Sequence, residues 1–214
     1  MGKDFSLANL VRDLDYAVNG TFVHQALFHI CPPRAGLTVL EPGCGSGKFG
    51  LSYALRGCAK VTMFDIDPSV VDYARRLMAA LEALRAGPVP AEINTGDIFK
   101  MPYDTGLFDL VMNEGIPQHW PDEERRQMCI NEMARVSRSI VAIIGNNGVN
   151  PREQEIDRTF QFGYVGMPQT RKCFTPEELL ERMKRAGLFD LKAQALDGNW
   201  ENARLFMAWG VKKT

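Results

Sequence analysis

Short apolar runs alternate with longer helical patterns along most of this 214-residue chain, and this alternation constrains the fold more than any other feature. The runs are rich in Val, Ile, Leu and Phe, and several are apolar on both faces, which is typical of strands inside a parallel sheet. A β-α-β-α series of this kind predicts an α/β sandwich. The five predicted strands cover residues 37–41, 60–65, 91–97, 108–113 and 139–145.

Helix signals lie between these strands and after them. Pro68 suits a first helical position behind a capping Asp67, and Thr175 precedes a pattern with early acids, late bases and a terminal Gly187. The last two predicted strands are joined by a turn-like Asp-Gly-Asn-Trp and form an antiparallel hairpin. We therefore expect a three-layer Rossmann-like sandwich with a seven-stranded, mostly parallel sheet and an antiparallel last strand. The predicted helices cover residues 47–56, 68–85, 122–136 and 175–187, and the hairpin strands cover about 188–196 and 203–212.

The chain is predicted to form one domain, residues 1–214, with two additions to the sheet. Residues 1–31 contain two amphipathic helical patterns and predict an N-terminal helical lid. Residues 147–173 are polar, aromatic and broken by Gly and Pro, so they predict an irregular insertion on the substrate side of the sheet. The basic and aromatic side chains of this insertion would suit an anionic or aromatic substrate, or simply form a solvated loop over core aromatics.

Composition and charge fit an ordinary globular enzyme. The chain is 45% hydrophobic and 24% charged with a net charge of -1, which argues against a dedicated nucleic-acid binder, whose footprint is a basic face. No apolar run approaches the ~18 residues of a membrane span, and the N-terminus has no signal-peptide core. The five cysteines are scattered without a C-x-x-C pair. We expect a cytoplasmic monomer or homodimer that acts on a small molecule and binds no nucleic acid.

The segment LEPGCGSGKFG, residues 40–50, matches parts of two nucleotide-binding loops. A phosphate-binding P-loop would need Gly at position 42 and Ser or Thr at position 49, where the chain has Pro42 and Phe49. The dinucleotide pattern G-x-G-x-x-G begins at Gly45, with Asp65 at the spacing of a ribose-binding acid. In that motif, however, the first Gly directly ends the strand, whereas three residues intervene here.

Glu41, ahead of every glycine of this loop, favours a different ligand. A carboxylate at the mouth of the loop would repel a pyrophosphate and suit a ligand with a cationic end. S-adenosylmethionine is such a ligand, because it has an ammonium group, a sulfonium and no phosphate. Asp65 at the end of the second strand can accept from its ribose hydroxyls. Asp97 and Ile98, after the third strand, suit an adenine edge, and Ile66 can pack on the ring.

These segments resemble class I S-adenosylmethionine-dependent methyltransferases, within the small-molecule group that includes ubiquinone- and menaquinone-biosynthesis methyltransferases. The resemblance rests on VLEPGCGSGKFG, VTMFDIDPSVVDYAR, INTGDIFKMPYDTGLFDLVMNEGIPQHWPD and EMARVSRSIVAIIG. It implies in-line transfer of a methyl group from S-adenosylmethionine to a small molecule, with S-adenosylhomocysteine as product. The cofactor-binding residues that it implies, together with those argued above, are Glu41, Gly43, Cys44, Gly45, Gly47, Asp65, Ile66, Asp97, Ile98, Asn113 and Glu114.

The acceptor side is less specified by the sequence. His119 follows the fourth strand, at the edge where α/β proteins bind ligands, and is the candidate general base; alternatively it orients the loop or packs beside Trp120. No metal is expected, because a metal-dependent O-methyltransferase would need acids after the fourth and fifth strands, and the fifth ends in amides. The candidate substrate residues, each of which could instead have a packing or turn role, are Tyr16, Asn146, Tyr164 and Arg171.

Two other functions stay open at this point. The same glycine loop could serve an NAD(P)-dependent oxidoreductase with a Rossmann loop. The chain could also bind its cofactor without turnover.

Overall fold

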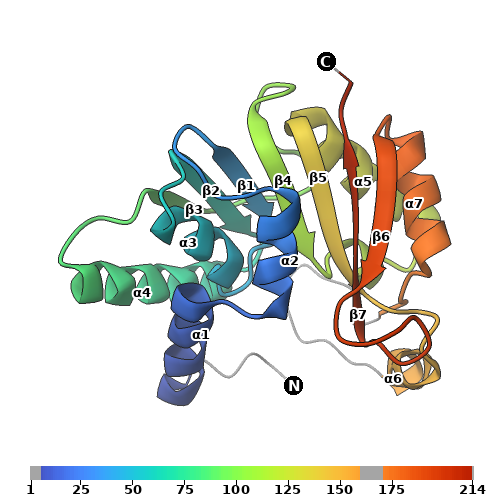
Figure 1. Cartoon of the computed structure of the whole chain (residues 1–214), viewed down its shortest axis with the longest axis horizontal. Coiled ribbons are helices and arrows are strands. Elements are labelled where there is room, and N and C mark those ends of the chain that lie inside the picture. Colours follow the sequence, from blue (N-terminus) through green and yellow to red (C-terminus); the bar gives the residue numbers. More distant parts are fainter. Residues whose placement is uncertain (1–5, 160–170, 214) are drawn as a thin grey trace. The chain divides into compact units, whose positions relative to one another are not determined.

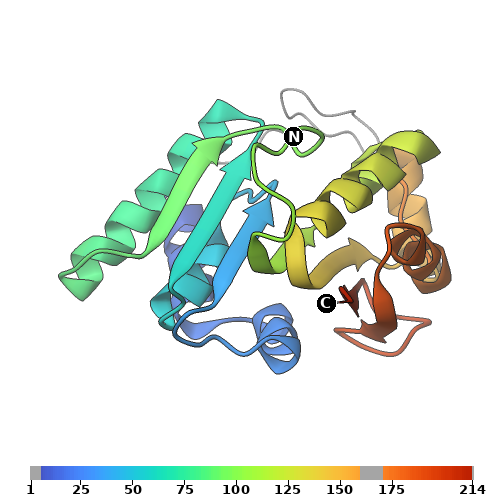
Figure 2. The same ribbon diagram turned by 90° about the horizontal axis from the view of Figure 1, so that it is seen from above.

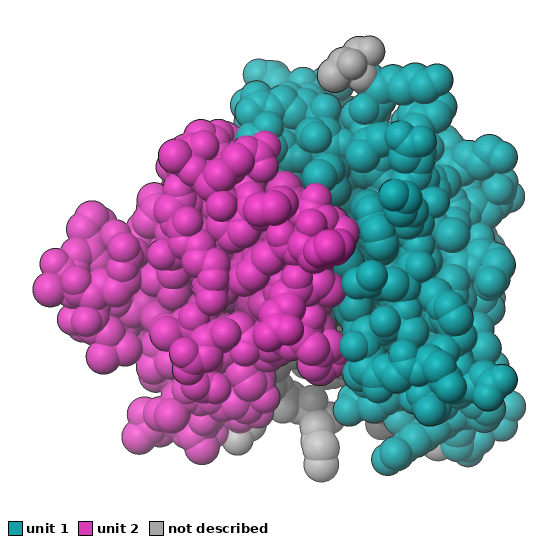
Figure 3. Space-filling view, in the orientation of Figure 1, with its two compact units in different colours: residues 1–2, 98–214 teal, residues 3–97 magenta. Residues whose placement is uncertain are grey.

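The computed structural model describes residues 6–159 and 171–213, and the chain divides into two compact units (Figure 3). Unit 2 comprises residues 3–97, and unit 1 comprises residues 1–2 and 98–214. The seven strands have the order β3-β2-β1-β4-β5-β7-β6. The predicted α/β class is confirmed, with a mostly parallel seven-stranded sheet and β7 antiparallel to both of its neighbours. A single domain over residues 1–214 stays a prediction.

Unit 2 contains three parallel strands, which lie side by side with α4 along them (Figure 2). The strands are apolar on both faces: Val39 and Leu40 of β1, and Val61 and Met63 of β2, are all fully buried. Such strands need cover on both sides, which agrees with the parallel arrangement. The elements of unit 2 are α1 (Leu7–Asn19), α2 (Phe22–Ile30), β1 (Thr38–Pro42), α3 (Lys48–Leu55), β2 (Lys60–Asp65), α4 (Pro68–Arg85) and β3 (Ala91–Thr95).

The caps of α4 and the anchoring of α1 explain where these helices lie. The Asp67 side chain accepts a hydrogen bond from the backbone N–H of Ser69, with Pro68 in the first turn, as the sequence predicted. Helix α1 packs against α3 and α4, where its buried Asp13 accepts from the hydroxyl of Tyr73 at 2.9 Å. Both predicted N-terminal helices are therefore present, and their role as a lid stays a prediction.

Unit 1 contains four strands, with β4 parallel to β5 and an antiparallel β6–β7 hairpin beside β5. Helices α5 and α7 pack against each other and against these strands (Figure 1). Thr175 caps α7, as predicted, and Asp122 caps α5 from just outside its first turn. The elements are β4 (Phe108–Glu114), the 3-10 turn η1 (Pro117–His119), α5 (Glu123–Val136), β5 (Ser137–Asn146), α6 (Pro151–Thr159), α7 (Pro176–Arg185), β6 (Phe189–Ala195) and β7 (Leu205–Val211).

The predicted irregular insertion, residues 147–173, begins with a helix that the sequence analysis missed. Helix α6 starts at Pro151, and the side chain of Asn150 accepts from the backbone N–H of Arg152 at 2.9 Å. Proline is compatible with a first helical turn, so it starts this helix where we expected a break. Residues 160–170, with the substrate candidate Tyr164, lie outside the described residues. Across residues 6–159 and 171–213, no helix has the length and apolar character needed to cross a membrane.

Candidate active site

The glycine loop after β1 is tied to the end of β2 within unit 2. Gly43, Gly45 and Gly47 have φ angles of 64°, 58° and 76°, in the left-handed region that glycine adopts without steric cost. The backbone N–H of Gly45 donates to Oδ2 of Asp65 at 3.0 Å, and the N–H of Cys44 donates to the carbonyl of Phe64 at 2.9 Å. The loop and the predicted ribose acid are therefore in direct contact.

Asp65 keeps acceptor capacity after binding the loop. Its Oδ1 accepts from the backbone N–H of Asp67 at 3.1 Å, so these two hydrogen bonds use about two of the four lone-pair sites that a carboxylate offers. The side chain is half-buried, as is Ile66 beside it. Gly96 donates its N–H to the carbonyl of Asp65 at 3.0 Å, which brings the exposed Asp97 to the same edge. A diol is a suitable partner for this edge.

Glu41 has a structural contact that the sequence analysis missed. It is 2% exposed, and its Oε2 accepts from the backbone N–H of Gly50 at 2.8 Å. This N–H belongs to the first turn of α3, where donors lack helical partners and a negative charge is stabilising. A Cβ at Gly50 would lie 2.9 Å from Glu41 Oε2 and 2.8 Å from Met63 Cγ. Glu41 therefore holds the start of α3, and its contact with a cofactor ammonium group stays a prediction.

His24 of α2 is a second buried polar group that contacts the start of α3. Its Nδ1 accepts from the backbone N–H of Thr21 at 3.0 Å, and its Nε2 lies 3.4 Å from the carbonyl of Lys48. The ring centroid is 4.5 Å from that of Phe49. Burial lowers the pKa of His24 to about 4. A neutral imidazole with its proton on Nε2 satisfies both contacts.

In unit 1, the loop after β4 carries the other predicted cofactor residues and His119. Asn113 is 1% exposed, and its Oδ1 accepts from the N–H of Ile116 at 2.9 Å, while Glu114 is half-buried. His119 lies in the η1 turn and is 7% exposed. Ile98, at the start of this unit, is also buried. The segment therefore buries Asn113 and His119, and the roles of its residues stay predictions.

Two predicted substrate residues, Asn146 and Arg171, are brought together through a third residue. Asn146 is hydrogen-bonded to Gln118 and to Glu153, and Arg171 is ion-paired with Glu153. Sequence reasoning missed Gln118 and Glu153: Gln118 lies in a segment that carries the resemblance but was given no role there, and Glu153 lies in the insertion, outside any motif. Tyr16 is half-buried on α1 in unit 2, with the guanidinium of Arg12 centred 6.0 Å from its ring.

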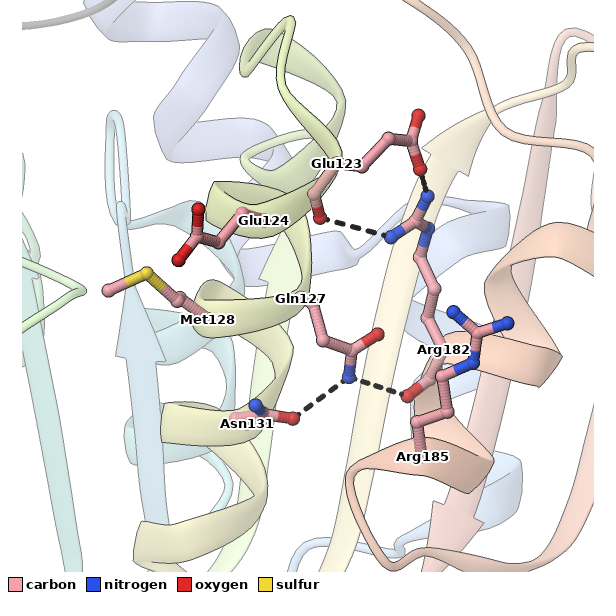
Figure 4. Close-up of a pocket in the computed structure, with 7 residues that line it drawn as sticks. All are labelled: Glu123, Glu124, Gln127, Met128, Asn131, Arg182 and Arg185. Carbon is pink, nitrogen blue, oxygen red and sulfur yellow. Dashed lines mark hydrogen bonds and ion pairs between the residues drawn. The ribbon is translucent and has the colours of Figure 1, made fainter.

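A groove of about 470 Å³ lies between α5 and α7 (Figure 4). No predicted site residue lines it. Gln127 donates to Asn131 Oδ1 at 2.8 Å and to the Arg182 carbonyl at 3.0 Å, whereas Oε1 of Gln127 and Nε of Arg182 are buried without a hydrogen-bond partner among the described residues. Ligands of α/β folds bind at the carboxyl ends of strands, whereas helices form this groove. We therefore assign it no cofactor. It is lined by Glu123, Glu124, Gln127, Met128, Asn131, Arg182 and Arg185.

The described part of the chain contains no group of three or more His, Cys, Asp or Glu side chains that could hold a metal ion.

Comparisons with known proteins agree with this geometry. Residues 39–139 match a family model described as a methyltransferase domain. The chain is 32% identical over 153 residues to ajmaline N-methyltransferase of Rauvolfia serpentina, covering 70% of this chain and 48% of that protein. It is 29% identical over 167 residues to chloroplastic 2-methyl-6-phytyl-1,4-hydroquinone methyltransferase 2 of Oryza sativa subsp. japonica. This match covers 77% of this chain and 42% of that protein. The chain thus spans less than half the length of these relatives.

A solved structure supports the fold assignment over the whole chain. Magnesium protoporphyrin IX methyltransferase from Synechocystis PCC 6803 with bound SAH superimposes with a TM-score of 0.66 at 16% identity, covering 100% of this chain and 90% of that one. The fold is that of the class I S-adenosylmethionine-dependent methyltransferases. The match to the methyltransferase domain model covers residues 39–139, and the same Synechocystis protein has also been solved with bound SAM. Membership of the ubiquinone and menaquinone subgroup stays a prediction.

Proposed function

We propose that this chain binds S-adenosylmethionine and transfers its methyl group to a small-molecule acceptor. The observation that carries the proposal is the contact between Gly45 of the glycine loop and Asp65 at the end of β2, inside the segment that matches a methyltransferase domain. The relatives named for ajmaline and for a phytyl hydroquinone support a small organic acceptor.

The charges at this edge of unit 2 fit the cofactor better than they fit a dinucleotide. Asp65 is half-buried, Asp97 is exposed, and Glu41 lies buried at the base of the loop. Carboxylates in these positions repel a pyrophosphate and attract a sulfonium or an ammonium group. These three carboxylates therefore favour S-adenosylmethionine over NAD(P), although both offer a ribose diol to Asp65.

S-adenosylmethionine would supply a methyl group bonded to a positively charged sulfur; the methyl carbon would bond to the acceptor as its bond to sulfur breaks, with S-adenosylhomocysteine as the leaving group. The chain's task is to align the reactants and exclude water. Asp65 of unit 2 would accept from the ribose hydroxyls, and Asn113 and Glu114 of unit 1 would have the methionine-side role that the resemblance implies. His119 takes a proton from the acceptor where that acceptor is protonated at neutral pH.

The surroundings of Arg171 favour an acceptor without a strong negative charge. Its side chain is 7% exposed, and it is paired with Glu153 at 3.1 Å and with Asp157 at 2.6 Å. Two carboxylates balance its charge, so it has little left to attract an anion. Of the two substrate classes that the insertion suggested, anionic and aromatic, the proposal therefore uses the aromatic one. A cytoplasmic location, a monomeric or homodimeric state and the absence of nucleic-acid binding remain proposals.

An acceptor panel tests the proposal. The purified chain is incubated with S-adenosylmethionine and separate amines, phenols, hydroquinones and carboxylates, and S-adenosylhomocysteine is measured by mass spectrometry. We expect acceptor-dependent S-adenosylhomocysteine with at least one uncharged or cationic acceptor. Tight cofactor binding without product across the panel would favour the alternative of a binding protein without turnover.

A further inference from the structure

We propose that Gln118 and Glu153 are positioning residues, which fix the turn carrying His119 to the segment 171–173 and to α6. The inference rests on the proposed function only for the role given to His119. The contacts themselves lie within unit 1 and among its described residues.

Gln118 joins three separate stretches of backbone with one buried side chain and one carbonyl. It is 3% exposed, and its Nε2 donates to Oδ1 of Asn146 at 2.7 Å. Its Oε1 accepts from the backbone N–H of Asn146 at 3.0 Å. The carbonyl of Gln118 accepts from the backbone N–H of Lys172 at 2.9 Å. The η1 turn is therefore bonded both to the end of β5 and to the segment 171–173.

Two glycines leave room for this side chain. A Cβ at Gly115 would lie 3.3 Å from Nε2 of Gln118, and a Cβ at Gly145 would lie 3.6 Å from its Oε1. Gly115 also has a φ of 82°, which other residues rarely adopt. The amide is thus held between two backbone segments, and its orientation is set by packing as well as by hydrogen bonds.

The contacts continue from Asn146 to α6 and return to the same segment. Nδ2 of Asn146 donates to Oε2 of Glu153 at 2.9 Å, and that oxygen lies 3.1 Å from Nη2 of Arg171. Nε of Arg171 donates to Oδ1 of Asp157 at 2.6 Å. Oδ2 of Asp157 accepts from the backbone N–H of Cys173 at 2.6 Å. With the bond between Lys172 and Gln118, these contacts form a closed ring.

Lys172 is tied to both neighbours of His119. Its N–H donates to the carbonyl of Gln118, and its own carbonyl accepts from Nη2 of Arg126 at 3.0 Å. Nε of Arg126 in turn donates to the carbonyl of Trp120 at 2.6 Å. A shift of the segment 171–173 therefore has two bonded routes to His119, one on each side.

Burial makes this ring sensitive to the loss of any member. Glu153 is 1% exposed, so removing its charge leaves the buried Arg171 with Asp157 as its remaining carboxylate partner within the ring. Buried polar networks lose much of their stabilisation when one member is unpaired. We therefore expect changes at α6 to alter the environment of His119 even though Glu153 does not belong to its turn.

The test uses the histidine side-chain NMR signals of the full chain. The chain has three histidines, so the imidazole ¹⁵N signals of His119 are assigned with one His119→Asn spectrum. The variants are Gln118→Ala and Glu153→Gln. Gln127→Ala is the matched control, because Gln127 also makes side-chain hydrogen bonds in unit 1 but lies outside the ring. Gln118→Glu, which keeps the side-chain size and one acceptor oxygen, replaces Gln118→Ala if the latter does not fold.

We expect His119 signals to shift in both ring variants and to stay at the wild-type positions in Gln127→Ala. The effect of Glu153→Gln should be smaller in a Gln118→Ala background, because changes at coupled sites are not additive. Unchanged His119 signals in folded ring variants, or equal shifts in the control, would overturn the proposal. The readout needs no turnover, so a chain without methyl transfer would still show the shifts if the positioning is correct.

Discussion

The buried His24 makes a defined prediction about stability and pH. Its pKa is lowered from 6.5 to about 4, chiefly by burial, so the folded state keeps the imidazole neutral. Above pH 6.5 neither state binds the proton. Between pH 6.5 and about 4 the unfolded chain binds it and the folded chain does not, so the free energy of unfolding falls as the pH falls. The loss amounts to about 2 kcal/mol at pH 5, and to about 3 kcal/mol in total.

The substitution His24→Gln isolates this contribution. Thr21 and His24 form a capping box at the start of α2, and Gln can accept from the same N–H. At neutral pH the free energy of unfolding of the variant should be about 1 kcal/mol lower than that of the wild type, because the ring contact with Phe49 is lost. Because Gln does not titrate, the variant should not show the fall in the free energy of unfolding that His24 causes in the wild type as the pH is lowered. Its free energy of unfolding should therefore approach or exceed that of the wild type near pH 5.

Urea unfolding followed by circular dichroism at a series of pH values measures the difference between the two proteins. His29→Gln is the matched control, because His29 lies on the same helix but is exposed. We expect it to follow the wild type across the series. A difference between wild type and His24→Gln that stays constant from neutral pH to about pH 5 would refute the argument, since burial would then not hold the imidazole neutral.

Two further substitutions test the edge of unit 2. Asp65→Asn should weaken S-adenosylhomocysteine binding by about tenfold in calorimetry, because hydrogen bonds to a charged acceptor are stronger than those to an amide. The control is Asp72→Asn, at an exposed position on α4. Equal affinities of the wild type and Asp65→Asn would remove Asp65 from the ribose role. Gly50→Ala should destabilise the chain by about 1 kcal/mol in thermal unfolding, because its Cβ would lie 2.8 Å from Cγ of the buried Met63 and overpacking outweighs the gain in helix propensity. Gly87→Ala, with nothing within 4 Å of its Cβ, should be neutral, and a loss of the same size there would contradict the packing argument.

The regular elements were predictable because their signals are local. β2 was predicted with the bounds that the structure has, since its residues are apolar on both faces. α4 likewise begins at Pro68 behind Asp67, because the cap and the proline lie next to each other in the sequence. The contact of Gly45 with Asp65 follows from the fold class, which brings the ends of neighbouring parallel strands to one edge.

The contacts that hold the site depend on distant residues and were not predictable from local patterns. The position of Glu41 predicted a bound ligand with a cationic end. Its hydrogen bond to the N–H of Gly50 is visible only once α3 is placed. Gln118 bonds to Asn146, 28 positions along the chain. A sequence shows which side chains reach an edge of the sheet, and it does not show which of their atoms already bind within the protein. Helix α6 escapes prediction for a different reason: Pro151 lies in a polar, Gly- and Pro-containing segment typical of a loop, whereas in the structure it is the first residue of a helix.

The central claim, that the glycine loop and Asp65 bind the methyl donor, is tested most directly by calorimetric titration of the purified chain. S-adenosylhomocysteine and NADH are titrated separately under the same conditions. The account predicts saturable binding of S-adenosylhomocysteine with a stoichiometry of about one per chain, and no measurable binding of NADH. Binding of NADH without binding of S-adenosylhomocysteine would contradict the account and favour an oxidoreductase.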